Sequence, residues 1–228
     1  MAQRANGYLH AFDGMFLDWD HVFGAGWRAV PREWVSVYRG CSVEELLKIA
    51  RVGLTAPAPE LRPPEVRAEL EAIDRFRPHH ILRRGVSRLQ AIEASLTSEV
   101  RRATRRIEAV IEMKVNPAEC AVVDQDAIAG ATSLLDRRGR KPDRLGGAYR
   151  AYWESLVPLK DFKKYYSSIR TADGQQWIRG TRAPKGLPES FFRPEVLVSS
   201  PRVSALHVRM VRPEWPDTEE EAGEWGFE

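Results

Sequence analysis

Glu195 is the residue whose type and setting most favour chemistry. It opens a short apolar run in the stretch FFRPEVLV, residues 191–198. Pro194, just before it, is tolerated at the first residue of a strand but not in its middle. Residues 171–190, upstream, are rich in Gly, Pro and Arg, so we expect Glu195 where a loop enters a sheet, a common place for a reacting acid. The structural alternative is a strand-edge carboxylate that only solvates the end of a sheet.

A second group of polar residues lies near the start of the chain, in the strand-like stretch VSVYRG, residues 35–40. Arg39 would end this strand beside Gly40, where the backbone can approach a ligand closely. The next residues, Ser42 to Glu45, fit a capping box that opens a helix to about residue 51. A helix N-terminus next to an arginine favours an anion such as a pyrophosphate. The alternative is an arginine that simply ends a surface strand.

Ser87 is the third candidate, in the sequence Gly-Val-Ser at residues 85–87. The pattern predicts a short strand over residues 81–87. Ser87 also fits a capping box with Gln90 and predicts a helix to about residue 106. That capping role is a complete structural explanation of the serine.

The chain carries, in this order, a strand-terminal arginine, a serine after a middle strand and a glutamate that opens a late strand. This order resembles the ADP-ribosyltransferase fold over roughly residues 35–211. The sequence predicts helices over residues 148–156 and 159–169. The chain is similar to bacterial nucleic-acid-modifying members of the DarT type in the run EVLV, in the second short strand at residues 206–211 that follows it and in the aromatic helix at residues 152–166 before it. The family cleaves NAD+ and passes ADP-ribose to an acceptor. The resemblance therefore implies NAD+ as a substrate and a split mixed β-sheet core with flanking helices, an α+β fold.

The resemblance also implies a role for each candidate. Glu195 would be the catalytic residue that hydrogen-bonds a ribose hydroxyl as positive charge grows on the sugar, and it would accept the acceptor's proton. Arg39 with Gly40 would clamp a phosphate or ribose, Ser87 would support the nicotinamide ribose, and Tyr38 would flank the cleft.

Two departures from the family pattern concern the acceptor and the serine. Many members carry Glu or Gln two residues before the catalytic Glu, but this chain has Arg193. That residue argues against transfer to arginine and is compatible with an anionic acceptor such as DNA or RNA, on whose bases Trp177 would stack. Family members usually show Ser-Thr-Ser where this chain has Gly-Val-Ser, which bears on the role of Ser87.

Charge is unevenly distributed along the 228 residues, whose formal net charge is +3. Residues 213–228 carry seven acidic and no basic side chains, so the rest of the chain has 35 Lys and Arg against 25 Asp and Glu. Residues 75–106 and 137–150 are especially rich in arginine. Such clusters can hold phosphates, or they can be solvated faces.

The sequence excludes several other classes of protein. No apolar run approaches the roughly 20 residues that span a membrane, and residues 1–14 lack the apolar core of a secretory signal. Cys41 and Cys120 have no metal-ligand spacing and are expected to be buried thiols. Asp124 and Asp126 suit a strand-end turn or a cation, but we expect no metal. A cytoplasmic location is favoured.

Three segments are expected. Residues 1–33 form an aromatic segment, in which Phe12, Phe16, Trp19 and Phe23 share one helical face that packs on a core or meets a partner. Residues 34–212 form the catalytic domain, with its clearest strand at 107–115. Residues 213–228 form an acidic tail expected to be disordered, which aids solubility or shields a basic cleft.

Function is expected to be mono-ADP-ribosylation of a macromolecule, either a nucleic acid or a protein. An NAD+ glycohydrolase, with water as the acceptor, is one alternative. A non-enzymatic module that binds nucleic acid or protein is the other. A nucleic-acid-modifying enzyme would be toxic to its host, and related proteins are often paired with an antitoxin.

Overall fold

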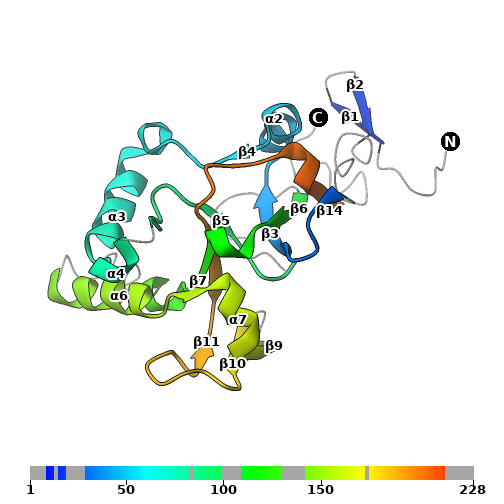
Figure 1. Ribbon diagram of the computed structural model, residues 1–228. Helices are drawn as coiled ribbons and strands as arrows, with labels where there is room; N and C mark the ends of the chain where they lie inside the picture. The colour runs from blue at the N-terminus through cyan, green and yellow to red at the C-terminus, as the bar shows by residue number, and fades with distance from the viewer. Residues whose placement is uncertain are drawn as a thin grey trace. The chain divides into compact units, whose positions relative to one another are not determined.

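The computed structural model describes residues 9–12, 15–18, 29–82, 85–98, 109–129, 142–172 and 175–213. The chain divides into two compact units. The first comprises Met1–Thr55, Thr97–Lys114 and Arg202–Glu228, and the second comprises Ala56–Leu96 and Val115–Pro201. Each unit combines helices with small sheets (Figure 1), which confirms the expected α+β class.

The main sheet of the first unit has three strands in the order β14-β6-β3. They are β3 (Val35–Cys41), β6 (Ala109–Val115) and β14 (Val208–Pro213). β14 runs antiparallel to β6, with Val208 opposite Met113. β6 confirms the strand predicted over residues 107–115, of which 107 and 108 lie outside the described residues.

Helix α2 (Val43–Val52) follows β3, as the capping box predicts. The Ser42 hydroxyl accepts the backbone N–H of Glu45 at 3.2 Å. The helix ends at Gly53, whose φ is 77° and whose N–H donates to the carbonyl of Ile49 at 2.8 Å. A Cβ at Gly53 would lie 2.5 Å from the carbonyl oxygen of Val203, so both conformation and space require glycine there.

Shorter elements complete the first unit. Strands β4 (Leu54–Thr55) and β13 (Arg202–Val203) pair antiparallel, and the 3-10 turn η4 (Ala205–His207) leads into β14. β1 (Leu9–Phe12) and β2 (Met15–Asp18) form an antiparallel hairpin.

The β1–β2 hairpin corrects the helix predicted for the aromatic segment. Phe12 pairs with Met15 and Phe16 pairs with Ala11, so these aromatics lie in strands. Aromatic residues favour strands, and the Asp-Gly pair between the two runs is a strong hairpin signal. Trp19 and Phe23 lie outside the described residues.

The central sheet of the second unit has four strands in the order β5-β12-β7-β8. They are β5 (Ile92–Ala94), β7 (Cys120–Asp124), β8 (Val157–Pro158) and β12 (Pro194–Val198). β12 runs antiparallel to both β5 and β7, and all five of its residues are buried. Pro194 is its first residue, the one place in a strand where proline was expected.

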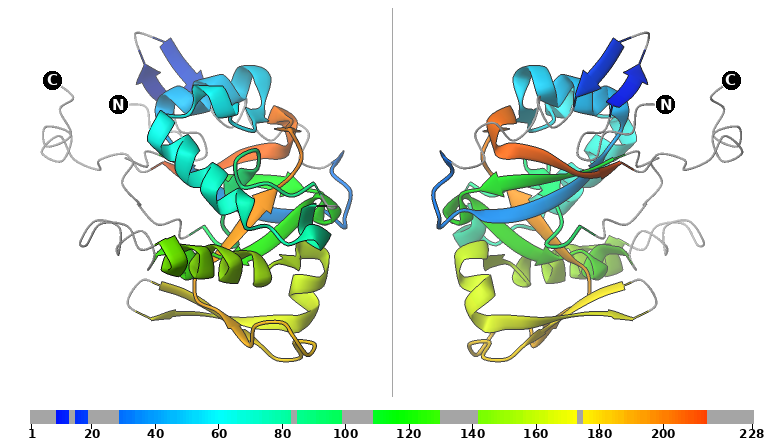
Figure 2. Two further views of the ribbon diagram at one scale, coloured as in Figure 1. Left: turned by 90° about the vertical axis from the view of Figure 1, so that its left-hand side faces the viewer. Right: turned by 90° about the vertical axis from the view of Figure 1, so that its right-hand side faces the viewer.

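Helices and a long hairpin surround this sheet within the second unit. The helices are α3 (Pro64–Arg75), α4 (His79–Leu82), α6 (Pro142–Glu154) and α7 (Leu159–Tyr165), with 3-10 turns η2 (Pro59–Leu61) and η3 (Pro117–Glu119). The remaining sheet, β11-β10-β9, comprises β9 (Tyr166–Ala172), β10 (Gln175–Gly180) and β11 (Ser190–Phe191). Figure 2 shows the β9–β10 hairpin running beneath α6 in both views.

The core of the second unit lies between the sheet and helices α3 and α6. Trp153 and Tyr152 of α6, Ile73 of α3 and Leu197 of β12 are completely buried and belong to one apolar cluster. The face of α3 that carries Val66, Leu70 and Ile73 is turned inward, because Leu70 and Ile73 are buried in that cluster and Val66 packs against it.

The strand predicted over residues 81–87 and the helix predicted from Ser87 to about 106 are wrong where the structure describes them. Residues 79–82 form α4, a turn follows, and β5 begins at Ile92. Gly85 has a φ of 69°, which breaks any regular element. Residues 99–108 lie outside the described residues.

The segment 171–190 is shorter as a loop than its composition indicates. Residues 171–172 end β9 and residues 175–180 form β10, so the irregular stretch is 181–189. The helix expected over residues 159–169 likewise ends at Tyr165, where the chain enters β9. Among residues 213–228, only Pro213 is described, as the last residue of β14.

Candidate functional site

Glu195 is the second residue of β12 and lies inside the second unit, only 6% exposed. Arg88 grips its carboxylate with two hydrogen bonds, from Nε to Oε2 at 3.3 Å and from Nη2 to Oε1 at 3.1 Å. The Tyr152 hydroxyl donates to Oε2 at 2.7 Å. The Arg88 guanidinium also lies 5.4 Å from the centre of the Tyr152 ring. The three side chains form one buried polar network.

The alternation of β12 explains why a carboxylate reaches this depth. Glu195 and Leu197 are two residues apart and so share a face of the strand. Leu197 belongs to the core cluster that contains Tyr152. Glu195 therefore projects toward α6, not into bulk solvent. A carboxylate there must be paired, because an unpaired buried charge is very costly.

The electrostatics of the network follow from burial and from the pair itself. Burial alone would lower the pKa of Arg88, but the Glu195 carboxylate, with Tyr152 and Glu93, raises it well above its ordinary value. Burial, followed by the Glu195 carboxylate, raises the pKa of Tyr152 well above its ordinary value. Arg88 is thus a permanent cation and Tyr152 a permanent hydroxyl donor across the physiological pH range.

The contacts leave part of the carboxylate free to accept. An ionised carboxylate has about four acceptor positions, two on each oxygen. Oε2 accepts both Arg88 Nε and Tyr152, whereas Oε1 accepts only Arg88 Nη2 among the contacts of the described residues. Counted over the described residues, one acceptor position on Oε1 is therefore unfilled.

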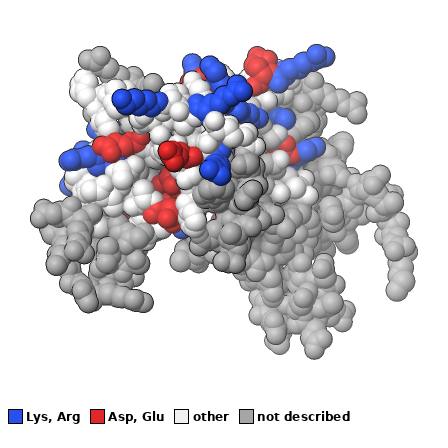
Figure 3. All heavy atoms as spheres, turned by 90° about the horizontal axis from the view of Figure 1, so that it is seen from below, with Lys and Arg blue, Asp and Glu red and all other residues white. Residues whose placement is uncertain are grey.

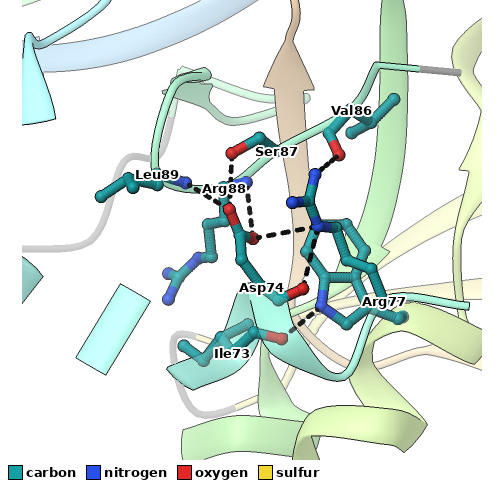
Figure 4. Close-up of polar contacts among 8 residues, drawn as sticks. Ile73, Asp74, Arg77, Val86, Ser87, Arg88 and Leu89 are labelled. Carbon is teal, nitrogen blue, oxygen red and sulfur yellow. Dashed lines mark hydrogen bonds and ion pairs between the residues drawn. The ribbon is translucent and has the colours of Figure 1, made fainter. Parts of the chain in front are cut away.

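Asp74, near the end of α3, anchors the turn that carries Arg88 (Figure 4). Its Oδ2 accepts the Ser87 hydroxyl at 2.5 Å and the Leu89 N–H at 3.4 Å, while Oδ1 accepts the Arg88 N–H at 3.1 Å. Figure 4 shows the Arg88 side chain leaving this turn away from the Asp74 carboxylate. Ser87 thus reaches Glu195 only through its neighbour Arg88.

Arg77 and Trp153 fix the end of α3 itself. Arg77 donates to the Asp74 carbonyl at 3.0 Å and to the Val86 carbonyl at 2.7 Å. Trp153 Nε1 donates to the carbonyl of Ile73 at 2.8 Å. The carbonyls of Ile73 and Asp74 thus receive side-chain donors in addition to the backbone N–H groups of Phe76 and Arg77.

Asp124 holds the other segment of the site, the two residues before Pro194. Its two carboxylate oxygens accept the backbone N–H groups of Phe192 at 3.1 Å and Arg193 at 3.0 Å. Ser155 in turn accepts the Asp124 N–H at 2.8 Å and donates to the Tyr152 carbonyl at 2.7 Å. This supports the strand-end turn over the cation site for Asp124, since both of its carboxylate oxygens already accept backbone N–H groups.

The remaining sequence-predicted residues fall in different places. Arg193 lies beside Glu195 in the second unit, and Trp177 lies in β10, opposite Arg170. Tyr38, Arg39 and Gly40 lie in β3 of the first unit.

Within the first unit, Arg39 donates to Glu45 at 2.8 Å, in the first turn of α2. A bound anion at this helix N-terminus would have to compete with that carboxylate. Burial, followed by the charge of Glu112, raises the pKa of Tyr38.

Sequence reasoning missed Arg88, Tyr152, Asp74 and Asp124 as members of the site. Arg88 lies in an arginine-rich window and Tyr152 in an aromatic helix, where neither is distinguishable from its neighbours. Asp74 bonds residues 13 to 15 positions away, and Arg88 bonds a residue 107 positions away. No local spacing signals such pairs.

Metal and membrane features are not found in the described part of the chain. No group of three or more His, Cys, Asp or Glu side chains there could hold a metal ion. None of its helices is long and apolar enough to cross a membrane. Both cysteines are buried thiols, as expected. Burial, followed by Glu119, raises the pKa of Cys120 from 9.0 to about 12, so its nucleophilic thiolate is scarce.

Comparison of the chain with protein-family models, with curated proteins and with solved structures finds no match.

Proposed function

We propose that this chain is a mono-ADP-ribosyltransferase that cleaves NAD+ and transfers ADP-ribose to a macromolecular acceptor. The observation that supports this most is the fixed orientation of Glu195, at the start of β12, by Arg88 and Tyr152. A catalytic carboxylate needs a defined direction, and preorganised groups of this kind are effective because they do not reorganise during the reaction. The order of Arg39, Ser87 and Glu195 along the chain, which resembles the transferase family, adds to this support.

The reaction breaks the bond between the ribose C1′ and the nicotinamide nitrogen. The bonding electron pair leaves with nicotinamide, and the sugar acquires positive charge. The free acceptor position on Oε1 of Glu195 suits a ribose hydroxyl, whose hydrogen bond strengthens as that charge grows. The acceptor then attacks C1′ on the opposite face, and Glu195 takes the proton it releases.

The acceptor that we favour is a nucleic acid, with a protein as the alternative. Arg193 stands two residues before Glu195, and Asp124 fixes its backbone; its guanidinium would attract an anionic acceptor. Trp177 would stack on a base. Figure 3 shows basic and acidic side chains of the described residues interspersed on the face that it draws.

Under this proposal the protein would act as a toxin in the cytoplasm, and an antitoxin would control it. An enzyme that modifies the host's nucleic acid would slow growth when expressed alone. Co-expression of a neutralising partner would restore growth.

One observation favours a different class of function. Glu195 and Arg88 are both largely buried, with side chains 7% and 9% exposed, and a pair of this kind also suits a purely structural role. In that case the chain is a non-enzymatic module that binds a nucleic acid or a protein. The NAD+ glycohydrolase remains a third possibility, because water can take the place of the acceptor.

The deciding experiment incubates wild type and Glu195→Gln with labelled NAD+ and separate pools of DNA, RNA and lysate protein. We expect nicotinamide release and a labelled nucleic-acid pool with wild type only. Glu154→Gln is the matched control, because Glu154 is an exposed residue two positions from Tyr152. Thermal melts would verify that each variant is folded.

Each other outcome has its own meaning. Free ADP-ribose without a labelled pool would identify a glycohydrolase, and label only in protein would replace nucleic acid as the acceptor. Equal activity in wild type and Glu195→Gln would remove Glu195 from catalysis. If folded wild type consumes no NAD+ in any pool, the transferase proposal is wrong and the binding module leads.

A further inference from the structure

Asp74 makes more contacts to the turn at residues 87–89 than any capping role predicts. It is 9% exposed and its carboxylate receives three donors from that turn: the Ser87 hydroxyl, the Arg88 N–H and the Leu89 N–H. We propose that Asp74 is a positioning residue of the candidate site. It holds the backbone of Arg88 where the Arg88 guanidinium can hydrogen-bond the Glu195 carboxylate. As a statement about catalysis, this rests on the proposed function.

The turn needs such an anchor because it has no regular structure of its own. Residues 85–91 belong to no helix or strand, and Gly85 has positive φ. Ser87 and Arg88 are nevertheless buried. Buried backbone N–H groups require partners, and here a carboxylate from a neighbouring helix takes that role. The conformation of the turn therefore depends on a residue outside it.

The link to Glu195 runs through one residue. The backbone N–H of Arg88 binds Asp74, and the side chain of the same residue binds Glu195. Fixing the backbone fixes the origin of a long side chain, and the Tyr152 ring 5.4 Å from the guanidinium supports its far end. A shift of the turn would draw the guanidinium off Glu195 and leave that carboxylate free to rotate.

Asp74 is itself fixed by contacts with Arg77, so it can restrict the position of Arg88. Arg77 binds the Asp74 carbonyl and also the Val86 carbonyl, which ties the end of α3 to the residue before Ser87. The Arg77 Nε lies 3.9 Å from Asp74 Oδ1, which balances the charge of the carboxylate. These contacts link the end of α3 to the turn at residues 87–89.

The kinetic test compares Asp74→Asn with wild type in nicotinamide release. Asparagine keeps the shape but turns one acceptor oxygen into a donor that faces other donors. We expect kcat to fall about 10- to 100-fold, since a 1 Å misplacement of a reacting group can cost about 100-fold. The KM for NAD+ should change less than about twofold, because Asp74 contacts no substrate.

Two further variants separate positioning from general damage. Ser87→Ala removes one of the three donors and should reduce kcat less than Asp74→Asn does. Adding Asp74→Asn to Arg88→Lys should cost little beyond the larger single effect, because both act through the same guanidinium. Glu65→Gln, an exposed acid on the same helix, is the matched control and should leave kcat unchanged.

A measurement that needs no enzymatic activity tests the positioning role of Asp74 separately from the proposed function. In 15N NMR spectra the Nε–H of Arg88 should be slow to exchange in wild type and in Glu65→Gln, because it is buried on Glu195. It should exchange fast in Asp74→Asn.

An unchanged Arg88 signal in Asp74→Asn would overturn the positioning role, as would strict multiplication of the Asp74 and Arg88 effects on kcat. If wild type releases no nicotinamide but the Arg88 signal responds to Asp74→Asn, the proposed function has failed and the structural linkage stands.

Discussion

The Arg88–Glu195 pair makes a quantitative prediction about stability that is independent of any activity. Replacing Arg88 by Met leaves the Glu195 carboxylate buried without its cation, and replacing Glu195 by Met leaves a buried cation without its carboxylate. Each single substitution should therefore be strongly destabilising. The double variant removes both charges and puts apolar side chains of similar size in their place.

The magnitude follows from the burial of the two groups. Their side chains are 9% and 7% exposed, so solvent cannot compensate a lost partner. Removing one member of a buried pair costs about 3–5 kcal/mol of unfolding free energy. For a chain of this size about 1 kcal/mol corresponds to roughly 2–4 °C in Tm, so each single variant should melt roughly 6–20 °C lower. The double variant should be more stable than either single variant, which requires an interaction energy larger than either single loss, about 3 kcal/mol or more.

The assay is urea unfolding followed by both far-UV circular dichroism and tryptophan fluorescence. Agreement of the two probes is the condition for a two-state free energy. Tyr152→Phe added to the double variant removes the hydroxyl that has lost its acceptor, which should recover part of the remaining loss, about 1 kcal/mol.

The matched control is the ion pair between Arg67 and Glu71 on α3, at 3.6 Å with side chains 45% and 42% exposed. The same double-mutant cycle there should give an interaction energy below about 0.5 kcal/mol, because exposed pairs contribute little. Additive effects of the Arg88 and Glu195 substitutions, or an equal interaction energy at the two sites, would refute the buried network.

Three further predictions test other parts of the molecule. Asp124→Ala should destabilise the protein by about 1–3 kcal/mol and speed hydrogen exchange at the backbone amides of Phe192 and Arg193, which donate to its carboxylate, whereas Asp126→Ala should do neither; unaltered exchange in the first variant would contradict the contact. Burial raises the pKa of Cys120 to about 12, so at pH 8 its thiolate fraction, and its alkylation by iodoacetamide, should be roughly a thousandfold below that of the unfolded chain. The same shift contributes stability in full below the ordinary thiol pKa of 9.0, and this contribution is lost as pH rises through about 12. Ser42→Ala should cost about 1 kcal/mol by loss of the α2 cap, and Ser42→Gly only a few tenths; equal losses would show that the cap contact is unimportant.

Features that depend on neighbours in sequence were predictable. The Ser42 cap and the extent of α2 to about residue 51 are local, and both are confirmed. Pro194 at the first residue of β12 follows from the absence of a backbone donor, and the existence of strand β6 follows from its local sequence. Each of these rests on a rule about adjacent residues.

Features that depend on distant partners were not predictable. Ser87 matches a capping box, but Asp74 takes its hydroxyl and the two following N–H groups. The tertiary hydrogen bonds of the buried Asp74 carboxylate override the local sequence pattern that predicts a helix. The same holds for Glu195, whose position in a strand was expected but whose burial depends on Arg88, 107 residues away. The sequence around Glu195 does not indicate which cation pairs with it.

The alternation of the chain between the two units has a consequence for its synthesis on the ribosome. Every segment of the second unit has been made once Pro201 is added, so this unit can fold as soon as residue 201 emerges. The three-stranded sheet of the first unit must wait for β14, which begins at Val208. Until then β6 lacks a neighbour and offers an open strand edge, a known site of aggregation. During this interval that edge can pair with another chain, and truncation before β14 would make the open edge permanent.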